Sequence, residues 1–159
     1  MSEFLEAALQ YAGRGWRVFP LKPRGKTPIL KGGFKLATVA PSQLEAWWGA
    51  WPDANVGIAT GLASNLIVYD LDGIKGLAYA RQLEQQLGPL PPTYAVRTGK
   101  GWHLYYELDA RHSIPGCSAG DGLDVRCEGG YTVAPPSIHP NGKRYEWLAG
   151  LSALADFAP

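Results

Sequence analysis

The stretch LIVYDLDG (residues 66–73) joins an apolar run to two carboxylates and a glycine. Its β-branched and aromatic residues predict a buried strand, because such residues are enriched in strands. Side chains two positions apart on a strand lie on one face, so we expect Asp70 and Asp72 to point the same way. Neighbouring carboxylates repel each other unless a cation neutralises them, and their hard oxygen atoms suit magnesium or manganese. A plain polar turn stays open as an alternative, because aspartate and glycine are common turn residues.

Two further residues favour a site for metal ions and phosphate. Asp124 lies between apolar residues in an apparent strand, where a carboxylate needs a partner or a cation. Three aspartates on strands could hold two divalent ions, an arrangement that activates a hydroxyl group in nucleotidyl transfer. His103 follows the turn TGKG (98–101), whose free backbone N–H groups and lysine suit a phosphate. A purely structural role is the alternative for this histidine.

The order of helices and strands around this stretch predicts an α+β fold with a mostly antiparallel sheet. Ser42 and Glu45 form a capping-box pattern ahead of three tryptophans, which we interpret as a packed helix face. Residues 109–121 are expected to form a loop. Helices are expected at 2–12, from Ser42 onward and at 74–88. Strands are expected at 16–21, 55–61, 65–72 and 143–148, with two more within 94–108. A hairpin is expected over 122–137, with its turn at Gly129 and Gly130.

Composition indicates one folded domain over residues 1–159. The 46% apolar and 18% charged residues exclude a disordered tail. No apolar run reaches the roughly 18 residues that span a bilayer, and the N-terminus lacks the pattern of a signal peptide. A cytoplasmic protein without membrane contact is therefore expected. A structural zinc site is an alternative with no supporting spacing, and its candidate ligands are Cys117, Cys127, His112 and His139.

Charge is distributed unevenly along the chain, although the net charge is only +1. Residues 7–44 contain seven basic residues and no acidic residue, which leaves eight basic and fourteen acidic residues elsewhere. This asymmetry indicates contact with a polyanion through the basic segment and a metal or acidic site further along the chain. A solvated basic loop is the alternative.

The motif VYDLDG (68–73) resembles the first motif of haloacid-dehalogenase-type phosphatases, whose first aspartate is a phosphorylated nucleophile. Isoleucine follows the Asp-Gly pair here, where that family has threonine. Asp121 and Asp124 are also too close together for the acidic motif of that family. A phosphatase therefore stays a minor alternative.

Nearly the whole chain is similar to the bifunctional primase–polymerase (prim-pol) domain of the archaeo-eukaryotic primase superfamily. The three motifs of the superfamily are an acid–x–acid pair, a small residue–x–His, and a later acid after a hydrophobic residue. These motifs fall in order on Asp70 and Asp72, on Gly101 and His103, and on Asp124. The flanking segments that also correspond are GWRVFPLKPRGKTPIL (15–30), NVGIATG (55–61) and APPS (134–137).

The resemblance implies a modified RNA-recognition-like sheet with flanking helices beside a smaller αβ unit, with the active site between them. It implies a DNA primase and polymerase, a nucleotidyltransferase that joins nucleoside triphosphates on a single-stranded DNA template with two Mg²⁺ or Mn²⁺ ions. The implied metal ligands are Asp70, Asp72 and Asp124, and His103 is the implied contact of the incoming phosphates. Many members of the superfamily have serine at the position of Gly101, so a side-chain contact with phosphate is missing there. Further candidate contacts of the nucleotide are Lys26, Arg97, Lys100, Gly101 and Arg126.

The implied partners are template and primer DNA, and a helicase module on a longer chain or on another protein. Other classes stay open, namely a catalytically inactive module that binds nucleotide or DNA, and a metal-dependent nuclease that needs no nucleoside triphosphate. The candidate contacts of the DNA backbone are Arg14, Arg17, Lys22, Arg24, Lys31, Lys35, Lys143 and Arg144.

Overall fold

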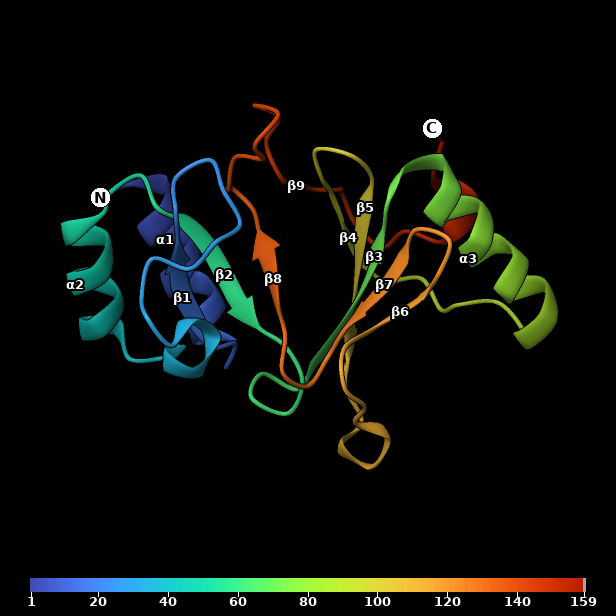
Figure 1. Ribbon diagram of the computed structural model, residues 1–159, viewed down its shortest axis with the longest axis horizontal. Coiled ribbons are helices and arrows are strands. Elements are labelled where there is room, and N and C mark those ends of the chain that lie inside the picture. Colours follow the sequence, from blue (N-terminus) through green and yellow to red (C-terminus); the bar gives the residue numbers. More distant parts are fainter. Residues whose placement is uncertain (159) are drawn as a thin grey trace.

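The computed structural model describes residues 1–158 and contains two antiparallel sheets, which approach each other at one end and spread apart at the other (Figure 1). Residue 159, the end of the expected domain, lies outside the described residues. Helices α1 and α2 cover the smaller sheet, and α3 covers the larger one, so the expected α+β class is confirmed. The helices are α1 (Glu3–Gly13), α2 (Pro41–Ala50) and α3 (Gly73–Leu87), with short 3₁₀ segments η1 (Gly33–Leu36), η2 (Ala110–His112) and η3 (Leu154–Asp156).

Each sheet draws its strands from distant parts of the sequence. The smaller sheet has the order β1-β2-β8, and the larger sheet has the order β6-β7-β3-β5-β4-β9. All pairs of neighbouring strands are antiparallel. The strands are β1 (Val18–Leu21), β2 (Asn55–Ala59), β3 (Leu66–Leu71), β4 (Tyr94–Arg97), β5 (Trp102–Glu107), β6 (Cys117–Gly120), β7 (Leu123–Arg126), β8 (Tyr131–Ala134) and β9 (Glu146–Trp147).

The two N-terminal helices pack on the smaller sheet through apolar side chains. Phe19 of β1 and Leu44 of α2 are fully buried, and Trp48 is nearly so, in one cluster. The burial of Trp48 confirms that the tryptophans after residue 42 belong to a packed helix face. The hydroxyl of Ser2 accepts a hydrogen bond from the backbone N–H of Leu5 at 3.2 Å, so the first helix begins as the sequence predicts.

The expected capping box before α2 is wrong. The helix begins at Pro41, and the residue before it, Ala40, offers no capping side chain. Proline favours the first helical position because its fixed φ suits the helix and its missing N–H leaves no unsatisfied donor. Ser42 therefore lies inside the helix and does not cap it.

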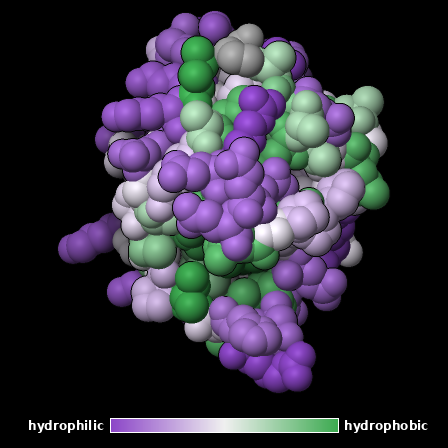
Figure 2. All heavy atoms as spheres, turned by 90° about the vertical axis from the view of Figure 1, so that its right-hand side faces the viewer, coloured by the Kyte–Doolittle hydropathy of each residue, from purple (hydrophilic) through white to green (hydrophobic). Residues whose placement is uncertain are grey.

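Helix α3 covers the outer face of the larger sheet. Its buried residues Leu77 and Ala80 join Leu71 of β3 and Trp102 of β5 in a second apolar cluster. Figure 2, which views the molecule from the side that carries α3, shows a mostly hydrophilic surface with scattered hydrophobic residues. No helix within residues 1–158 is long and apolar enough to cross a membrane.

The expected hairpin over residues 122–137 is wrong, because its two strands lie in different sheets. Strand β7 pairs with β3 and β6, whereas β8 pairs with β2. The chain crosses between the sheets after β2, after β7 and after β8, and the first two crossings are bonded to each other. The hydroxyl of Thr60 donates to the carbonyl oxygen of Cys127 at 2.7 Å, and the Thr60 N–H donates to the carbonyl oxygen of Gly130 at 3.1 Å.

The expected loop over residues 109–121 is also wrong in its second half. Residues 117–120 form the edge strand β6, paired with β7 through a register shift between Ser118 and Gly120. The last expected strand, at 143–148, is reduced to the two residues of β9 at the other edge of the sheet. These errors concern pairing partners, which a local pattern of alternating residues does not specify.

Candidate active site

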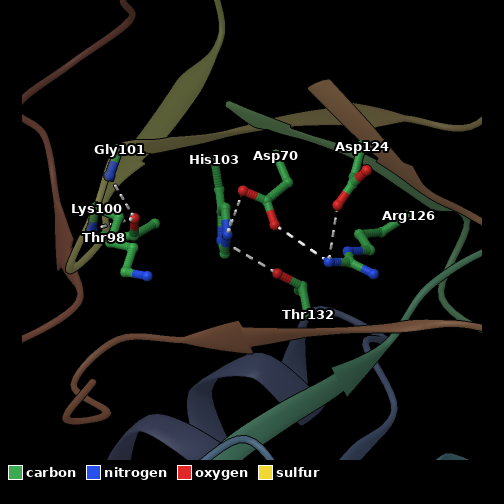
Figure 3. Close-up of polar contacts among 8 residues, drawn as sticks. All are labelled: Asp70, Thr98, Lys100, Gly101, His103, Asp124, Arg126 and Thr132. Carbon is green, nitrogen blue, oxygen red and sulfur yellow. Dashed lines mark hydrogen bonds and ion pairs between the residues drawn. The ribbon is translucent and has the colours of Figure 1, made fainter. Parts of the chain in front are cut away.

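A row of three polar side chains crosses the middle of the larger sheet. Strand β3 lies between β5 and β7, and Asp70 is directly opposite His103 on one side and Asp124 on the other. Side chains that face each other across neighbouring antiparallel strands lie close together on one face of the sheet. The sheet therefore brings together one residue from each of the three sequence motifs (Figure 3).

Asp70 holds the central position of this row and is bound from both sides. Its Oδ1 lies 3.5 Å from His103 Nε2, and its Oδ2 accepts from Arg126 Nη2 at 3.3 Å. Burial by itself would raise the pKa of Asp70, but the contacts with His103 and Arg126 outweigh burial and lower the pKa below its ordinary value. Asp70 is therefore a carboxylate at neutral pH.

Arg126 lies between the two aspartates of the row. Its Nη2 is 3.3 Å from Asp70 Oδ2 and 3.5 Å from Asp124 Oδ2 (Figure 3). Like charges directly opposite each other on neighbouring strands are destabilising, so a cation at this point is needed. In this structure the guanidinium group of Arg126 provides that cation.

His103 connects the row to the smaller sheet. Its side chain is 8% exposed, and its Nδ1 lies 3.2 Å from the hydroxyl oxygen of Thr132 on β8. Both contacts are satisfied when Nε2 donates to Asp70 and Nδ1 accepts from the Thr132 hydroxyl. The two ring nitrogens of His103 are thus both engaged within the protein.

A cavity of about 240 Å³ lies over this row, between the two sheets. Asp70, His103 and Arg126 line it from the larger sheet, and β8 with the turn before it lines it from the smaller sheet. Lys26, from the loop after β1, and Tyr145 also line the cavity. Of the residues expected to contact nucleotide, Lys26, His103 and Arg126 therefore share one hollow.

Asp72 does not belong to this row. Strand β3 ends at Leu71, and Asp72 is the exposed residue before α3. The expectation that Asp72 continues the strand is wrong, because Gly73, with φ of +65°, turns the chain directly into the helix. The backbone N–H of Asp72 donates to the carbonyl oxygen of Gly122 at 2.7 Å, which fixes it beside the turn that leads to β7.

The turn TGKG (98–101) is arranged differently from the expected phosphate loop. The hydroxyl of Thr98 accepts from the backbone N–H of Gly101 at 2.9 Å and from that of Lys100 at 3.3 Å (Figure 3). These N–H groups are therefore used within the turn. A Cβ atom on Gly101 would overlap the carbonyl oxygen of Leu71, so only glycine fits where many members of the superfamily have serine.

The remaining basic candidates lie outside the cavity of Asp70. Arg14 lies over the ring of Trp16 at 5.8 Å, in a separate hollow of about 1100 Å³. Arg144 is paired with Glu3 at 2.8 Å. Arg97 is exposed at the end of β4 and is not among the residues that line the cavity of Asp70. The other candidates are all exposed, and they are Arg17, Lys22, Arg24, Lys31, Lys35 and Lys143.

The donor set fits a divalent cation at Asp70 and Asp124. The side chains of these aspartates are 24% and 44% exposed, and both are held by the same guanidinium group, which a metal ion could replace. Within residues 1–158, no three His, Cys, Asp or Glu side chains form a group that could hold a metal ion as arranged. The same finding removes support for a zinc site at the cysteines and at His112 and His139.

Two residues of the cavity carry no signal in the sequence. Thr132 lies in a strand whose pairing partner is distant, and its contact with His103 depends on how the two sheets meet. Tyr145 is 2% exposed and lies in a short segment between loop and edge strand. The family segment APPS (134–137) lies close to Thr132 in the sequence but contains neither residue.

The sequence matches the family model for the N-terminal domain of bifunctional DNA primase/polymerases (Prim-Pol) over residues 8–159. The chain therefore belongs to the Prim-Pol family, and the match confirms the resemblance drawn from the motifs. Membership assigns it to the nucleotidyltransferases of the DNA primase/polymerase type. No curated protein matches the chain.

Proposed function

We propose that the chain joins nucleoside triphosphates on a single-stranded DNA template, with Asp70 and Asp124 holding divalent metal ions and Asp72 assisting from the start of α3. The observation that supports this function most strongly is the pairing of Asp70 with Asp124 and His103 on neighbouring strands under a cavity. Mg²⁺ or Mn²⁺ ions, when bound, would lower the pKa of the attacking hydroxyl group and neutralise charge on the triphosphate.

The protein residues have separate tasks in this proposal. His103 orients Asp70, since its other ring nitrogen is held by Thr132. Arg126 balances the charges of the two aspartates until a metal ion takes its place, and its guanidinium group is then available to phosphate oxygens. Lys26 lines the same cavity and supplies a second positive charge for the triphosphate.

The template is proposed to contact the basic residues of segment 14–35 through its phosphates. Such contacts release counterions, so the affinity for DNA should fall steeply as salt concentration rises. They are independent of base sequence, as a polymerase that copies any template requires.

Template-directed synthesis tests the proposal directly. The protein is incubated with single-stranded template, labelled nucleoside triphosphates and Mg²⁺ or Mn²⁺, with and without a primer. The proposal expects products that depend on the template and are lost in the double variant Asp70→Ala, Asp72→Ala. The double variant Asp109→Ala, Asp121→Ala is a matched control, because both residues are exposed acids that do not line the cavity.

Other results would point to the alternative classes. Degradation of DNA without nucleoside triphosphate would indicate a nuclease that uses the same acids to activate water. Metal-dependent binding of nucleotide without synthesis would indicate an inactive binding module. Either result would overturn the proposed activity.

A further inference from the structure

The loop after β8 brings a second histidine next to the cavity. His139 is 5% exposed, and its ring lies so close to Gly99 that a Cβ atom there would overlap it. The ring centroid of Tyr145 is 5.9 Å from that of His139 and 6.0 Å from that of His103. Because Tyr145 and His103 both line the cavity, His139 lies one aromatic ring from it.

The hydrogen bonding of His139 leaves one donor without a partner. Its Nδ1 accepts from the backbone N–H of Asn141 at 3.0 Å, so in the neutral ring the proton is on Nε2. Burial lowers the pKa of His139, and the charge of Lys26 lowers it further, which favours the neutral ring. Nε2 forms no hydrogen bond within residues 1–158.

Two ammonium groups accompany this N–H donor. Lys26 lines the cavity, and Lys100 directly follows Gly99, against which the ring of His139 packs. Neither lysine forms an ion pair within residues 1–158. Asp72 is the carboxylate that acts on the pKa of His139 in the direction opposite to that of Lys26. Two lysines and an N–H donor that converge in this way suit the oxygen atoms of a phosphate.

The loops that carry these groups are fixed to each other. The side-chain amide of Asn141 donates to the carbonyl oxygen of Gly99 at 2.9 Å, and its Oδ1 accepts from the Lys143 N–H at 3.0 Å. The turn before β5 and the loop after β8 are therefore joined at the point where Gly99 and His139 meet. A donor held by such contacts is oriented before a ligand arrives, which reduces the entropic cost of binding.

We propose that His139, Lys26 and Lys100 form a subsite for the terminal phosphates of a nucleoside triphosphate, with His139 Nε2–H donating to a phosphate oxygen. This inference rests on the proposed function, because it assumes that the cavity over Asp70 holds the nucleotide. The reacting phosphate must lie at the aspartates, so the remaining phosphates extend past Tyr145 toward His139. A phosphate of a DNA backbone offers the same oxygen atoms, and the experiment must separate the two sources.

Two substitutions separate the roles of the two ring nitrogens. In His139→Asn the amide oxygen can still accept from the Asn141 N–H, but the distal donor is lost. In His139→Gln the side-chain amide can place an N–H near the position of Nε2, but the acceptor for Asn141 is lost. His112→Asn is the control, because His112 is exposed and lies outside the cavity.

Binding is measured by titration calorimetry with tripolyphosphate, a nucleoside triphosphate, the corresponding monophosphate and a short single-stranded oligonucleotide. Thermal unfolding of each variant is recorded alongside. We expect His139→Asn to weaken binding of tripolyphosphate and of the triphosphate about tenfold, as for the loss of a hydrogen bond to a charged group. Monophosphate binding should be unchanged, and His139→Gln should bind the triphosphate more tightly than His139→Asn does.

Three results would overturn the subsite. The first is an unchanged affinity of His139→Asn for tripolyphosphate, or no binding of tripolyphosphate by the wild-type chain. The second is a loss of affinity for the oligonucleotide alone, which would assign the phosphate to DNA. The third is a His139→Gln variant that binds as poorly as His139→Asn and unfolds at a lower temperature, which would make His139 structural. Failure of template-directed synthesis would refute the proposed function and leave the tripolyphosphate comparison intact.

Discussion

The two walls of the cavity differ in the kind of side chain that they contribute. The wall from the larger sheet contributes Asp70, His103 and Arg126, with Asp70 in contact with both of the others, and Arg126 also contacts Asp124 beside the cavity. The wall from β8 of the smaller sheet is uncharged and contributes the hydroxyl of Thr132, which bonds His103. Lys26 reaches the cavity separately, from the loop after β1. Apart from Lys26, the charged groups of the cavity lie on the wall from the larger sheet (the charged wall), and the orientation of His103 is controlled from the wall of β8 (the neutral wall). Each of the following predictions changes one wall and leaves the other in place.

The largest effect on the free energy of unfolding is expected at Gly101, directly before β5. Gly101→Ala would place a Cβ atom onto the carbonyl oxygen of Leu71, and the chain would have to separate β3 from β5 to make room. We expect a loss of about 3 kcal/mol or more in the free energy of unfolding, measured by chemical denaturation.

Gly49→Ala is the matched control for this change. Gly49 lies in α2, and nothing is within 4 Å of an added Cβ atom. Alanine favours a helix over glycine, so this variant should gain up to about 1 kcal/mol. Equal effects of the two substitutions would show that the close approach at Gly101 does not constrain the sheet.

The next effect concerns the cation within the charged wall. Arg126→Met leaves Asp70 and Asp124 facing each other without a positive charge, which should cost about 1–2 kcal/mol in the absence of metal. Mn²⁺ or Mg²⁺ should restore much of this loss, because a divalent ion can take the place of the guanidinium group. The measurement is the shift of the unfolding temperature on addition of metal, compared between the variant and the wild-type chain.

Arg111→Met is the control for the metal effect. Arg111 pairs with Asp109 on the surface, with its side chain 83% exposed, so its loss should not change the response to metal. A metal-induced shift in Arg126→Met no larger than in Arg111→Met would contradict a metal site at the two aspartates.

A smaller effect is expected on the neutral wall. Thr132→Val keeps the size of the side chain but removes the hydroxyl group that holds His103 Nδ1. One buried hydrogen bond is lost, so stability should fall by about 1 kcal/mol. Synthesis should also fall, because His103 is then free to turn away from Asp70.

Ser137→Ala is the control for this change. The Ser137 hydroxyl accepts from the Val56 N–H outside the cavity, so its loss should lower stability and leave synthesis unchanged. An equal loss of synthesis in Thr132→Val and Ser137→Ala would refute the orientation of His103 by Thr132.

The charged wall could be predicted from the sequence to a greater extent than the neutral wall. Asp70, His103 and Asp124 are polar residues in apolar strands, and such a pattern is local. Asp72 shares the motif but lies two residues beyond the row of Asp70, past the end of the strand at Leu71. Arg126 was expected near the phosphates, and the structure adds its contact with both aspartates.

The neutral wall depends on contacts between distant segments. Thr132 reaches His103 only because β7 and β8 separate into different sheets, where the sequence predicts a hairpin. A turn of two glycines is compatible with a hairpin and with a crossing between sheets. The crossing forms because β7 pairs with β3 and β8 pairs with β2. Tyr145 and His139 lie in loops whose position is set by the fold as a whole, so residue type alone did not predict their place at the cavity.

The smallest effect is the response of the charged wall to acid. Burial would raise the pKa of Asp70, but His103 and Arg126 outweigh it and lower the pKa. A carboxylate with a lowered pKa in the folded chain adds stability above its unfolded pKa of about 3.9, and this stability is lost as pH falls through the folded value. The difference in unfolding free energy between the wild-type chain and Asp70→Asn should therefore be largest near neutral pH and shrink as the solution becomes strongly acidic.

Asp109 provides a surface pair with which to compare this response. Hydrogen bonds from Arg111 lower the pKa of Asp109 to about 2, and both side chains of this pair are exposed on the surface. Salt screens exposed charges more strongly than sheltered ones. The acid response removed by Asp109→Asn should therefore disappear at high salt, whereas that removed by Asp70→Asn should persist. If both disappear, solvent reaches the row of Asp70, His103 and Asp124 freely, and the cavity does not shelter its charges.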